Sequence, residues 1–241
     1  MIDGRRVLAV VPARGGSKGI RLKNLRTVGG ISLVSRAAMT ACRVASIDRA
    51  IVSTDHDDIA AAAEAAGLAA PFRRPELLSG DRIGDWDVLH HALLAMEALD
   101  GVGYDIVVML QPTSPGRTPV HVETALRHLV DGHFDAVWTV SETDSKGHPL
   151  KQLLVDADSV DYYDPRGASI IARQELQPVY HRNGLVYAMT RQCILEQKTI
   201  KGTRTGAVVI EQLVPNIDTE LDIEWAEFLL CRNGDPLDAA P

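Results

Sequence analysis

Aromatic residues are scarce in this sequence, at 5% of 241 residues, although 46% of the residues are hydrophobic. The core is therefore expected to be aliphatic, which suits a mostly parallel sheet covered by helices. Only three cysteines are present, Cys42, Cys193 and Cys231, and none forms a CxxC pair. This sparse set argues against a disulfide scaffold or a zinc site, and it predicts a reducing, cytoplasmic location.

Positive charge and long apolar runs are scarce as well. The formal net charge is −7 at pH 7, so a broad basic face for nucleic acid is not expected. The first apolar run, residues 7–11, is too short for a membrane span or a secretory signal. The sequence therefore predicts a protein that binds neither nucleic acid nor membranes.

Short aliphatic runs alternate with helical patterns over the first 140 residues. This alternation predicts an α/β fold, a three-layer, doubly wound arrangement around a mostly parallel sheet. Strands are expected at residues 7–11, 49–54, 106–110 and 136–140, and helices at 32–42, 57–66, 85–99 and 120–130.

The pattern changes after residue 140. Residues 141–180 are polar and broken by Gly and Pro, which predicts a hairpin-like excursion or small subdomain within a single domain spanning residues 1–241. Strands at 183–189 and 207–213 and a helix at 219–231 are expected to follow, and the tail from residue 233 is expected to be frayed.

The strongest local signal is the basic, glycine-rich loop at residues 12–24, which reads Pro-Ala-Arg-Gly-Gly-Ser-Lys-Gly-Ile-Arg-Leu-Lys-Asn. Its glycines let backbone N–H groups turn toward an anion without obstruction by Cβ atoms. Arg14, Lys18, Arg21 and Lys23 place four cations within ten residues. Ligands of open α/β sheets bind beyond the carboxyl ends of the strands, where this loop lies. A triphosphate-binding loop is predicted, although GxxxxGK[ST] and GxGxxG are both absent; the alternative is an exposed basic turn.

This loop resembles the N-terminal signature of the acylneuraminate cytidylyltransferases, which make CMP-sialic acids and the related CMP-pseudaminic and CMP-legionaminic acids. Further similar segments follow in the family's order, so that the resemblance covers about residues 7–230: 52–55, 73–81, 110–117, 173–187 and 216–222. The chain departs from the family at Arg21, often Pro, and at Gly116, usually Leu. The resemblance implies a nucleotide-diphospho-sugar transferase-like fold with a small excursion for dimerisation.

The resemblance also implies roles for individual residues. Arg14, Lys18 and Gln111 would be catalytic, with Lys18 stabilising charge on the phosphates. The implied nucleotide contacts are Ala13, Gly15, Gly16, Ser17, Asn24, Arg74 and Ser79, and the implied sugar contacts are Gln111, Arg173, Asn183 and Tyr187. Arg173 would pair with the carboxylate of the sugar, because a guanidinium fork binds a carboxylate in bidentate fashion.

A magnesium ion is implied by the last similar segment, where the family commonly has Asp-x-Asp. Here the first acidic position is Asn216 and the second is Asp218. An amide oxygen can bind Mg²⁺ but carries no charge, so Asp218 is the expected ligand and the contribution of Asn216 stays open. Alternatively, Asp218 is only the N-cap of the following helix. Asp222 is expected to be structural, and Asp55 to cap the helix that begins near residue 57.

The implied reaction is attack by the anomeric hydroxyl of an acidic keto-sugar, a nonulosonic acid, on the α-phosphorus of CTP, with release of pyrophosphate. Such a displacement needs alignment and charge neutralisation. No Ser-His-Asp set is present, so no covalent intermediate is expected, and no general base can be named. A homodimer with residues 141–180 in its contact is implied.

Two alternatives remain open from the sequence. One is a CMP-Kdo-type synthetase, whose family loop usually has Arg-x-x-Ser-x-Arg-Leu-Pro-Gly-Lys. The other is a catalytically weak nucleotide-binding homologue, which the replacement of an acidic residue by Asn216 favours.

Overall fold

In the computed structural model, which describes residues 1–238, the aliphatic runs form one six-stranded sheet in the order β10-β6-β9-β5-β1-β4. Strand β1 pairs in parallel with β4 and β5, and β10 pairs in parallel with β6. Strand β9 is antiparallel to both β5 and β6, because the chain leaves β6 for an excursion and returns directly along it. The strands are β1 (Val7–Pro12), β4 (Arg49–Ser53), β5 (Ile106–Met109), β6 (Ala136–Glu142), β9 (Tyr180–Thr190) and β10 (Thr205–Val209).

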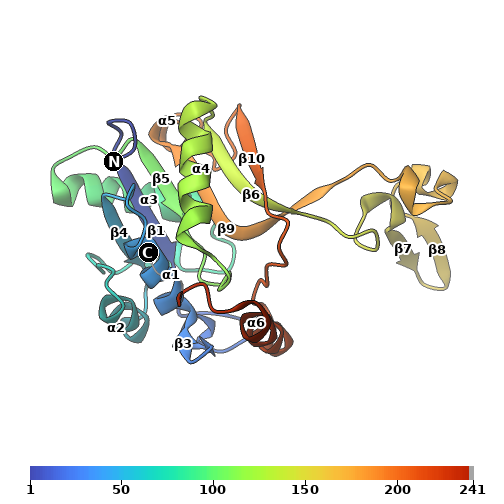
Figure 1. Ribbon diagram of the computed structural model, residues 1–241, viewed down its shortest axis with the longest axis horizontal. Helices are drawn as coiled ribbons and strands as arrows, with labels where there is room; N and C mark the ends of the chain where they lie inside the picture. Colours follow the sequence, from blue (N-terminus) through green and yellow to red (C-terminus); the bar gives the residue numbers. More distant parts are fainter. Residues whose placement is uncertain (239–241) are drawn as a thin grey trace.

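Helices cover both faces of this sheet (Figure 1). Successive residues of β1 point to opposite faces, so Val7 and Val11 enter one core while Leu8 and Val10 enter the other. The first core is covered by α1 (Leu33–Cys42), α2 (Asp57–Ala65) and α4 (Pro119–Asp131), and the second by α3 (Asp85–Asp100) and α5 (Arg191–Leu195). The predicted three-layer, mostly parallel α/β fold is confirmed.

The helices begin and end close to their expected bounds because local capping signals are satisfied. Ser32 caps α1 by accepting a hydrogen bond from the Ser35 N–H at 3.2 Å. Thr118 caps α4 in the same way, and Thr219 caps the closing helix α6 (Glu220–Asn233). The short elements β2 (Thr27–Val28), β3 (Ile31–Ser32) and α5 were not predicted, because so few residues show no periodic apolar pattern.

The excursion between β6 and β9 contains an antiparallel hairpin, β7 (Leu153–Asp156) and β8 (Ser159–Tyr162). It projects away from the sheet, and every residue of both strands is exposed (Figure 1). The hairpin lies within the residues for which a hairpin-like excursion is predicted.

The segment after α6 differs from the expectation of a frayed tail. Asp235 accepts a hydrogen bond at 2.9 Å from Nη1 of the buried Arg36, and Leu237 is buried as well. Residues 235–237 are therefore docked against α1, while residues 239–241 lie outside the described part of the chain.

No helix within residues 1–238 combines the length and the apolar composition that a bilayer span requires.

Candidate active site

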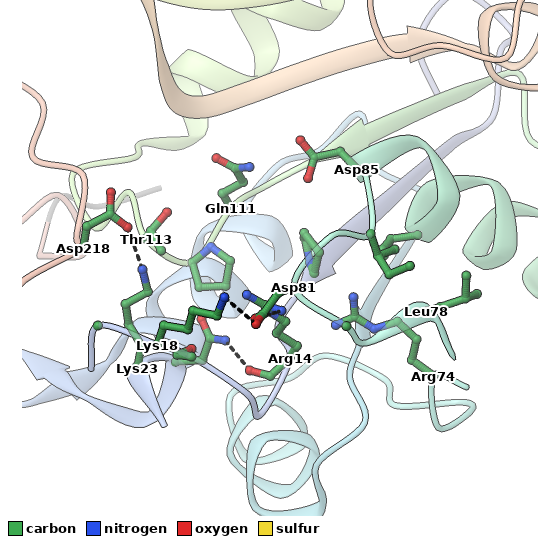
Figure 2. Close-up of a pocket in the computed structure, with 18 residues that line it drawn as sticks. Arg14, Lys18, Lys23, Arg74, Leu78, Asp81, Asp85, Gln111, Thr113 and Asp218 are labelled. Atoms are coloured by element: carbon green, nitrogen blue, oxygen red, sulfur yellow. Dashed lines mark hydrogen bonds and ion pairs between the residues drawn. The ribbon is translucent and has the colours of Figure 1, made fainter. Parts of the chain in front are cut away.

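A cavity of about 560 Å³ opens at the carboxyl ends of β1 and β5. Its walls come from the loop after β1, from residues 74–88, from the turn after β5 and from the segment before α6 (Figure 2). Seven residues predicted for the site line this one cavity: Arg14, Ser17, Lys18, Asn24, Arg74, Gln111 and Asp218. Segments far apart in the sequence thus meet as the resemblance implied.

Two cations of the glycine-rich loop bind the same carboxylate in this cavity. Nη1 of Arg14 and Nζ of Lys18 each lie 2.8 Å from an oxygen of Asp81. The hydrogen bond from Lys18, and with it that from Arg14, lowers the pKa of the Asp81 carboxyl. Donors that converge on a carboxylate are also suited to the oxygens of a phosphate. Sequence reasoning missed Asp81 as a partner of the loop, because the sequence does not show which carboxylate meets these cations.

The loop is held in place by contacts on its far side. The Gly15 N–H donates to Asp55 at 2.8 Å, and the Asn24 amide donates to the Arg14 carbonyl at 2.9 Å. A Cβ on Gly15 would lie 2.8 Å from the His56 ring, so this position needs glycine. The prediction that Asp55 caps α2 was wrong, because His56 is the N-cap. Asp55 positions the loop instead.

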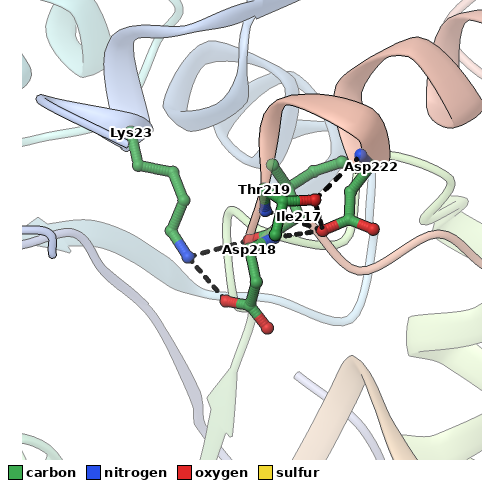
Figure 3. Close-up of polar contacts among 5 residues, drawn as sticks. All are labelled: Lys23, Ile217, Asp218, Thr219 and Asp222. Atoms are coloured by element: carbon green, nitrogen blue, oxygen red, sulfur yellow. Dashed lines mark hydrogen bonds and ion pairs between the residues drawn. The ribbon is translucent and has the colours of Figure 1, made fainter. Parts of the chain in front are cut away.

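The other end of the loop is fastened to the segment before α6 (Figure 3). Nζ of Lys23 donates to the Ile217 carbonyl and to the Asp218 carboxylate, both at 2.8 Å. A Cβ on Gly19 would lie 2.6 Å from the Asp218 carbonyl oxygen, so the two backbones meet closely. The loop and the start of α6 therefore form one wall of the cavity.

Asp218 is free of the helix cap, since Thr219 is the N-cap of α6. The alternative that Asp218 is merely that cap is wrong. Asp222 accepts hydrogen bonds from the backbone N–H groups of Asp218 at 2.9 Å and Thr219 at 2.7 Å, so its structural role is confirmed. Figure 3 shows the Asp218 carboxylate turned toward Lys23 and away from the Asp222 carboxylate.

The residues around Asp218 fit a magnesium ion that a nucleotide shares. Mg²⁺ is commonly held by one or two carboxylates together with substrate phosphates and water. The Asp218 side chain is 75% exposed and faces the cavity, which leaves room for water ligands. Within residues 1–238 no group of three His, Cys, Asp or Glu side chains could hold a metal alone, and Asn216 does not line the cavity. Any ion here would rest on Asp218.

Arg74 and Ser79 have different positions although both were predicted as nucleotide contacts. Arg74 lines the cavity, donates from Nη2 to the Ser53 carbonyl at 3.0 Å, and leaves Nε without a partner among the described residues. Burial lowers the pKa of its guanidinium. Ser79 is outside the lining because its hydroxyl bonds back to the Pro75 carbonyl at 3.2 Å and closes a turn.

The turn that carries Gln111 is tied to β9 by the fully buried Arg117. Its Nε donates to the Leu185 carbonyl at 2.5 Å, and its Nη2 donates to the carbonyls of Gln111 and Gly184. Burial lowers the pKa of Arg117 to about 9, yet the side chain stays charged at neutral pH. Arg117 thus determines where Gln111 lies, a role that the sequence did not indicate.

Two predicted sugar contacts on β9 face the core rather than the cavity. The Asn183 amide accepts from the Thr139 hydroxyl at 2.7 Å and donates to the Ser141 hydroxyl at 3.0 Å, so its hydrogen bonds are used within the sheet. Tyr187 is 3% exposed and packs edge-to-face against Trp138. Neither side chain lines the cavity.

Arg173 lies in the excursion and lines a separate cavity of about 320 Å³ with residues 142–145. Within one chain it is therefore not brought together with Gln111. Three predicted loop positions, Ala13, Gly15 and Gly16, are also absent from the lining of the main cavity. Ala13 is fully buried and its N–H donates to the Ser53 carbonyl at 3.0 Å, so Ala13 shapes the loop rather than faces the cavity.

A family model described as cytidylyltransferase matches residues 8–230. This chain belongs to the cytidylyltransferase family. This chain is 31% identical to the CMP-N,N'-diacetyllegionaminic acid synthase of Legionella pneumophila, over 92% of this chain and 94% of that protein. It is 28% identical to the pseudaminic acid cytidylyltransferase of Campylobacter jejuni, over 92% and 95% of the two chains.

A solved structure of CMP:2-keto-3-deoxy-manno-octonic acid synthetase complexed with CTP is similar in fold to this cytidylyltransferase. The TM-score is 0.68 at 20% identity, with 94% of this chain and 99% of that chain covered. The resemblance to acylneuraminate cytidylyltransferases and the assignment as a nucleotidyltransferase are confirmed by the family match and the relatives.

Proposed function

We propose that this cytidylyltransferase transfers CMP from CTP to the anomeric hydroxyl of a nonulosonic acid and releases pyrophosphate. The observation that carries the proposal is the convergence of Arg14, Lys18 and Gln111 with Asp218 on one cavity. The names of the relatives support a nine-carbon acidic sugar as the acceptor. The three free cysteines support a cytoplasmic location.

Arg14 and Lys18 form a cationic wall of the cavity, and the main requirement of the reaction is that charge on the phosphates is neutralised. Arg14 and Lys18 already converge on the Asp81 carboxylate, so they can bind and align phosphate oxygens and stabilise the charge that develops there. Arg74 also lines the cavity, and its guanidinium is suited to an additional contact to the nucleotide. Gln111, held by Arg117, is positioned to donate to or accept from the sugar.

Asp218 would hold Mg²⁺ against the triphosphate. A bound Mg²⁺ supplies charge neutralisation on the phosphate oxygens. Because Lys23 binds the same carboxylate, it can keep Asp218 turned toward the cavity in the absence of the ion.

Pyrophosphate release tests the proposal. With CTP and Mg²⁺, we expect release on addition of legionaminic, pseudaminic or N-acetylneuraminic acid, and much less when ATP, GTP or UTP replaces CTP. No release with any of these acids would contradict the enzyme proposal and favour the weak, nucleotide-binding alternative. Faster release with the eight-carbon acid Kdo would favour the CMP-Kdo-type alternative.

A homodimer formed through the excursion is part of the proposal. The hairpin exposes apolar side chains that pair across its strands, with Val155 72% and Val160 63% exposed. Large exposed apolar surfaces are typical of protein contacts. Because Arg173 lies outside the cavity of its own chain, we propose that it reaches the sugar carboxylate from the excursion of a second copy.

We expect the intact protein to sediment as a dimer, and the double variant V155D/V160D to shift toward monomer, because two charges on one apolar face are costly to bury. Ser159→Asp, which adds a charge at a polar position of the same hairpin, is the matched control and should leave the dimer intact. Sedimentation of the intact protein as a monomer would contradict the proposed contact.

A further inference from the structure

Three carboxylates line the main cavity, and two of them are paired with cations. Asp81 is paired with two cations of the loop, and Asp218 is paired with Lys23. The Asp85 carboxylate has no hydrogen-bond or ion-pair partner within residues 1–238. A half-buried carboxylate without a hydrogen-bond partner remains available to accept a hydrogen bond from a ligand in this cavity.

The backbone at Asp85 is firmly held. Asp85 is the first residue of α3, and the N–H of Gly84 donates to the Asp87 carboxylate at 3.2 Å. The indole of Trp86 donates to the Ile194 carbonyl at 2.8 Å. The side chain of Asp85 is therefore presented to the cavity by a fixed helix rather than by a mobile loop.

Asp85 lies apart from the cationic wall. In Figure 2 the side chains of Asp85 and Gln111 lie along one side of the cavity, and Arg14 and Lys18 with their shared Asp81 lie along another. A triphosphate bound on the cationic wall leaves Asp85 and Gln111 on the side from which a second substrate can approach. The Asp85 carboxylate is thus closer to the side open to a second substrate than to the side proposed for the phosphates.

The surroundings of Asp85 increase its basicity. Burial raises the pKa of its carboxyl, and the charge of Arg182 opposes this shift. The charged and titratable groups that face it are Arg182 and Tyr187, both from β9, and the pKa of Tyr187 is itself raised by burial. The Arg182 guanidinium also makes a cation–π contact with Trp138, with its Cζ atom 5.4 Å from the ring centroid. A carboxylate of raised pKa is a better acceptor for a proton from a hydroxyl.

We propose that Asp85 is the catalytic base that accepts the proton of the attacking sugar hydroxyl, an assignment that rests on the proposed function. As the hydroxyl oxygen forms its bond to the α-phosphorus, its proton passes to the Asp85 carboxylate. The bond between the α-phosphorus and the oxygen shared with the β-phosphorus breaks, and pyrophosphate leaves with that electron pair. Neutral Asp85 then returns the proton to water.

The test compares kcat, KM and pH profiles of variants at this helix turn. Asp85→Asn should lower kcat by about 100-fold or more, with the KM for CTP and the Mg²⁺ requirement changed by less than about threefold. The unchanged protein should lose activity as the pH falls through the raised pKa of Asp85, and D85N should show no such acid limb. Asp85→Glu should keep the acid limb at a reduced kcat. Asp87→Asn removes a charge from the same turn outside the cavity lining, and its amide oxygen can still accept the hydrogen bond from the Gly84 N–H, so kcat should stay within about twofold.

Several outcomes would overturn the assignment. A higher KM for either substrate with unchanged kcat would make Asp85 a binding contact, and a shifted Mg²⁺ requirement would make it a metal ligand. If D85N does not fold, the pH profiles of the unchanged protein and of D85E decide instead. The absence of an acid limb in both profiles would overturn the assignment of Asp85 as the base. If both the unchanged protein and D85N are active, only the role of Asp85 is overturned. If the unchanged protein releases no pyrophosphate, the proposed function is overturned as well.

Discussion

Replacing Lys18 by alanine is expected to lower kcat for pyrophosphate release by about 100- to 1,000-fold, or about 3–4 kcal/mol of transition-state stabilisation. Its Nζ lies 2.8 Å from the Asp81 carboxylate, on the wall where phosphate oxygens are proposed to bind. The loss should be in kcat more than in KM, because charge builds up on these oxygens as pyrophosphate leaves. The Lys18 side chain is 80% exposed, so the free energy of unfolding should change by less than about 0.5 kcal/mol.

Steady-state pyrophosphate release at saturating CTP and sugar measures the effect of the Lys18 change, and urea unfolding measures stability. Arg21→Ala is the matched control, since Arg21 carries the same charge in the same loop but is exposed and does not line the cavity. Its kcat should stay within about twofold of the unchanged protein. Equal activity of the Lys18 and Arg21 variants would show that the loop is only a basic turn.

Replacing Arg117 by methionine is expected to lower the free energy of unfolding by about 3 kcal/mol or more, because each buried carbonyl left without a donor costs about 1–3 kcal/mol. The guanidinium donates to the carbonyls of Gln111, Gly184 and Leu185, and methionine can donate to none of them. Lysine in this place should recover little of the loss, since it lacks the planar fork that reaches both β9 and the Gln111 turn.

Urea unfolding compares the Arg117 variant with Arg127→Met. Arg127 is an exposed arginine of α4, the helix that follows Arg117, and it forms a 3.6 Å ion pair with Asp3. The control should change stability by less than about 1 kcal/mol. Activity offers a second measurement, because the Gln111 turn is held by Arg117 and kcat should fall even where the variant is folded. A variant of Arg117 as stable as the Arg127 control would contradict this role.

Much of the architecture could be predicted because it depends on local composition. The runs at 7–11 and 106–110 are apolar throughout, and the run at 49–54 has an apolar centre. Such runs are typical of parallel strands buried on both faces, and all three form strands of the sheet. The direction of β9 could not be predicted, since a strand's orientation depends on how the chain returns from the excursion. The docked tail was missed because the partner of Asp235 is Arg36, 199 residues away.

The site was predicted best where a short segment both carries the chemistry and ends a strand, as for Arg14, Lys18 and Gln111. Prediction failed where a polar side chain could equally serve the backbone or the sheet. Ser79 closes a turn and Asn183 bonds within the sheet, although both have side chains suited to a ligand. Asp81 and Asp85 were overlooked because carboxylates in a phosphate site are recognised only from their neighbours.

The sequence by itself determined the strands, the loops that follow them and the concentration of positive charge in one of those loops, because each of these depends on residues close together in the chain. Only the tertiary structure decided which carboxylates bind those charges and which one stays unpaired. Arg14 and Asp81 are 67 residues apart and Lys23 and Asp218 are 195 apart, so each pairing exists only once the sheet brings separate loops to one edge. Whether two charges pair depends on the distance between them in the folded chain, and the order of residues along the sequence does not give that distance.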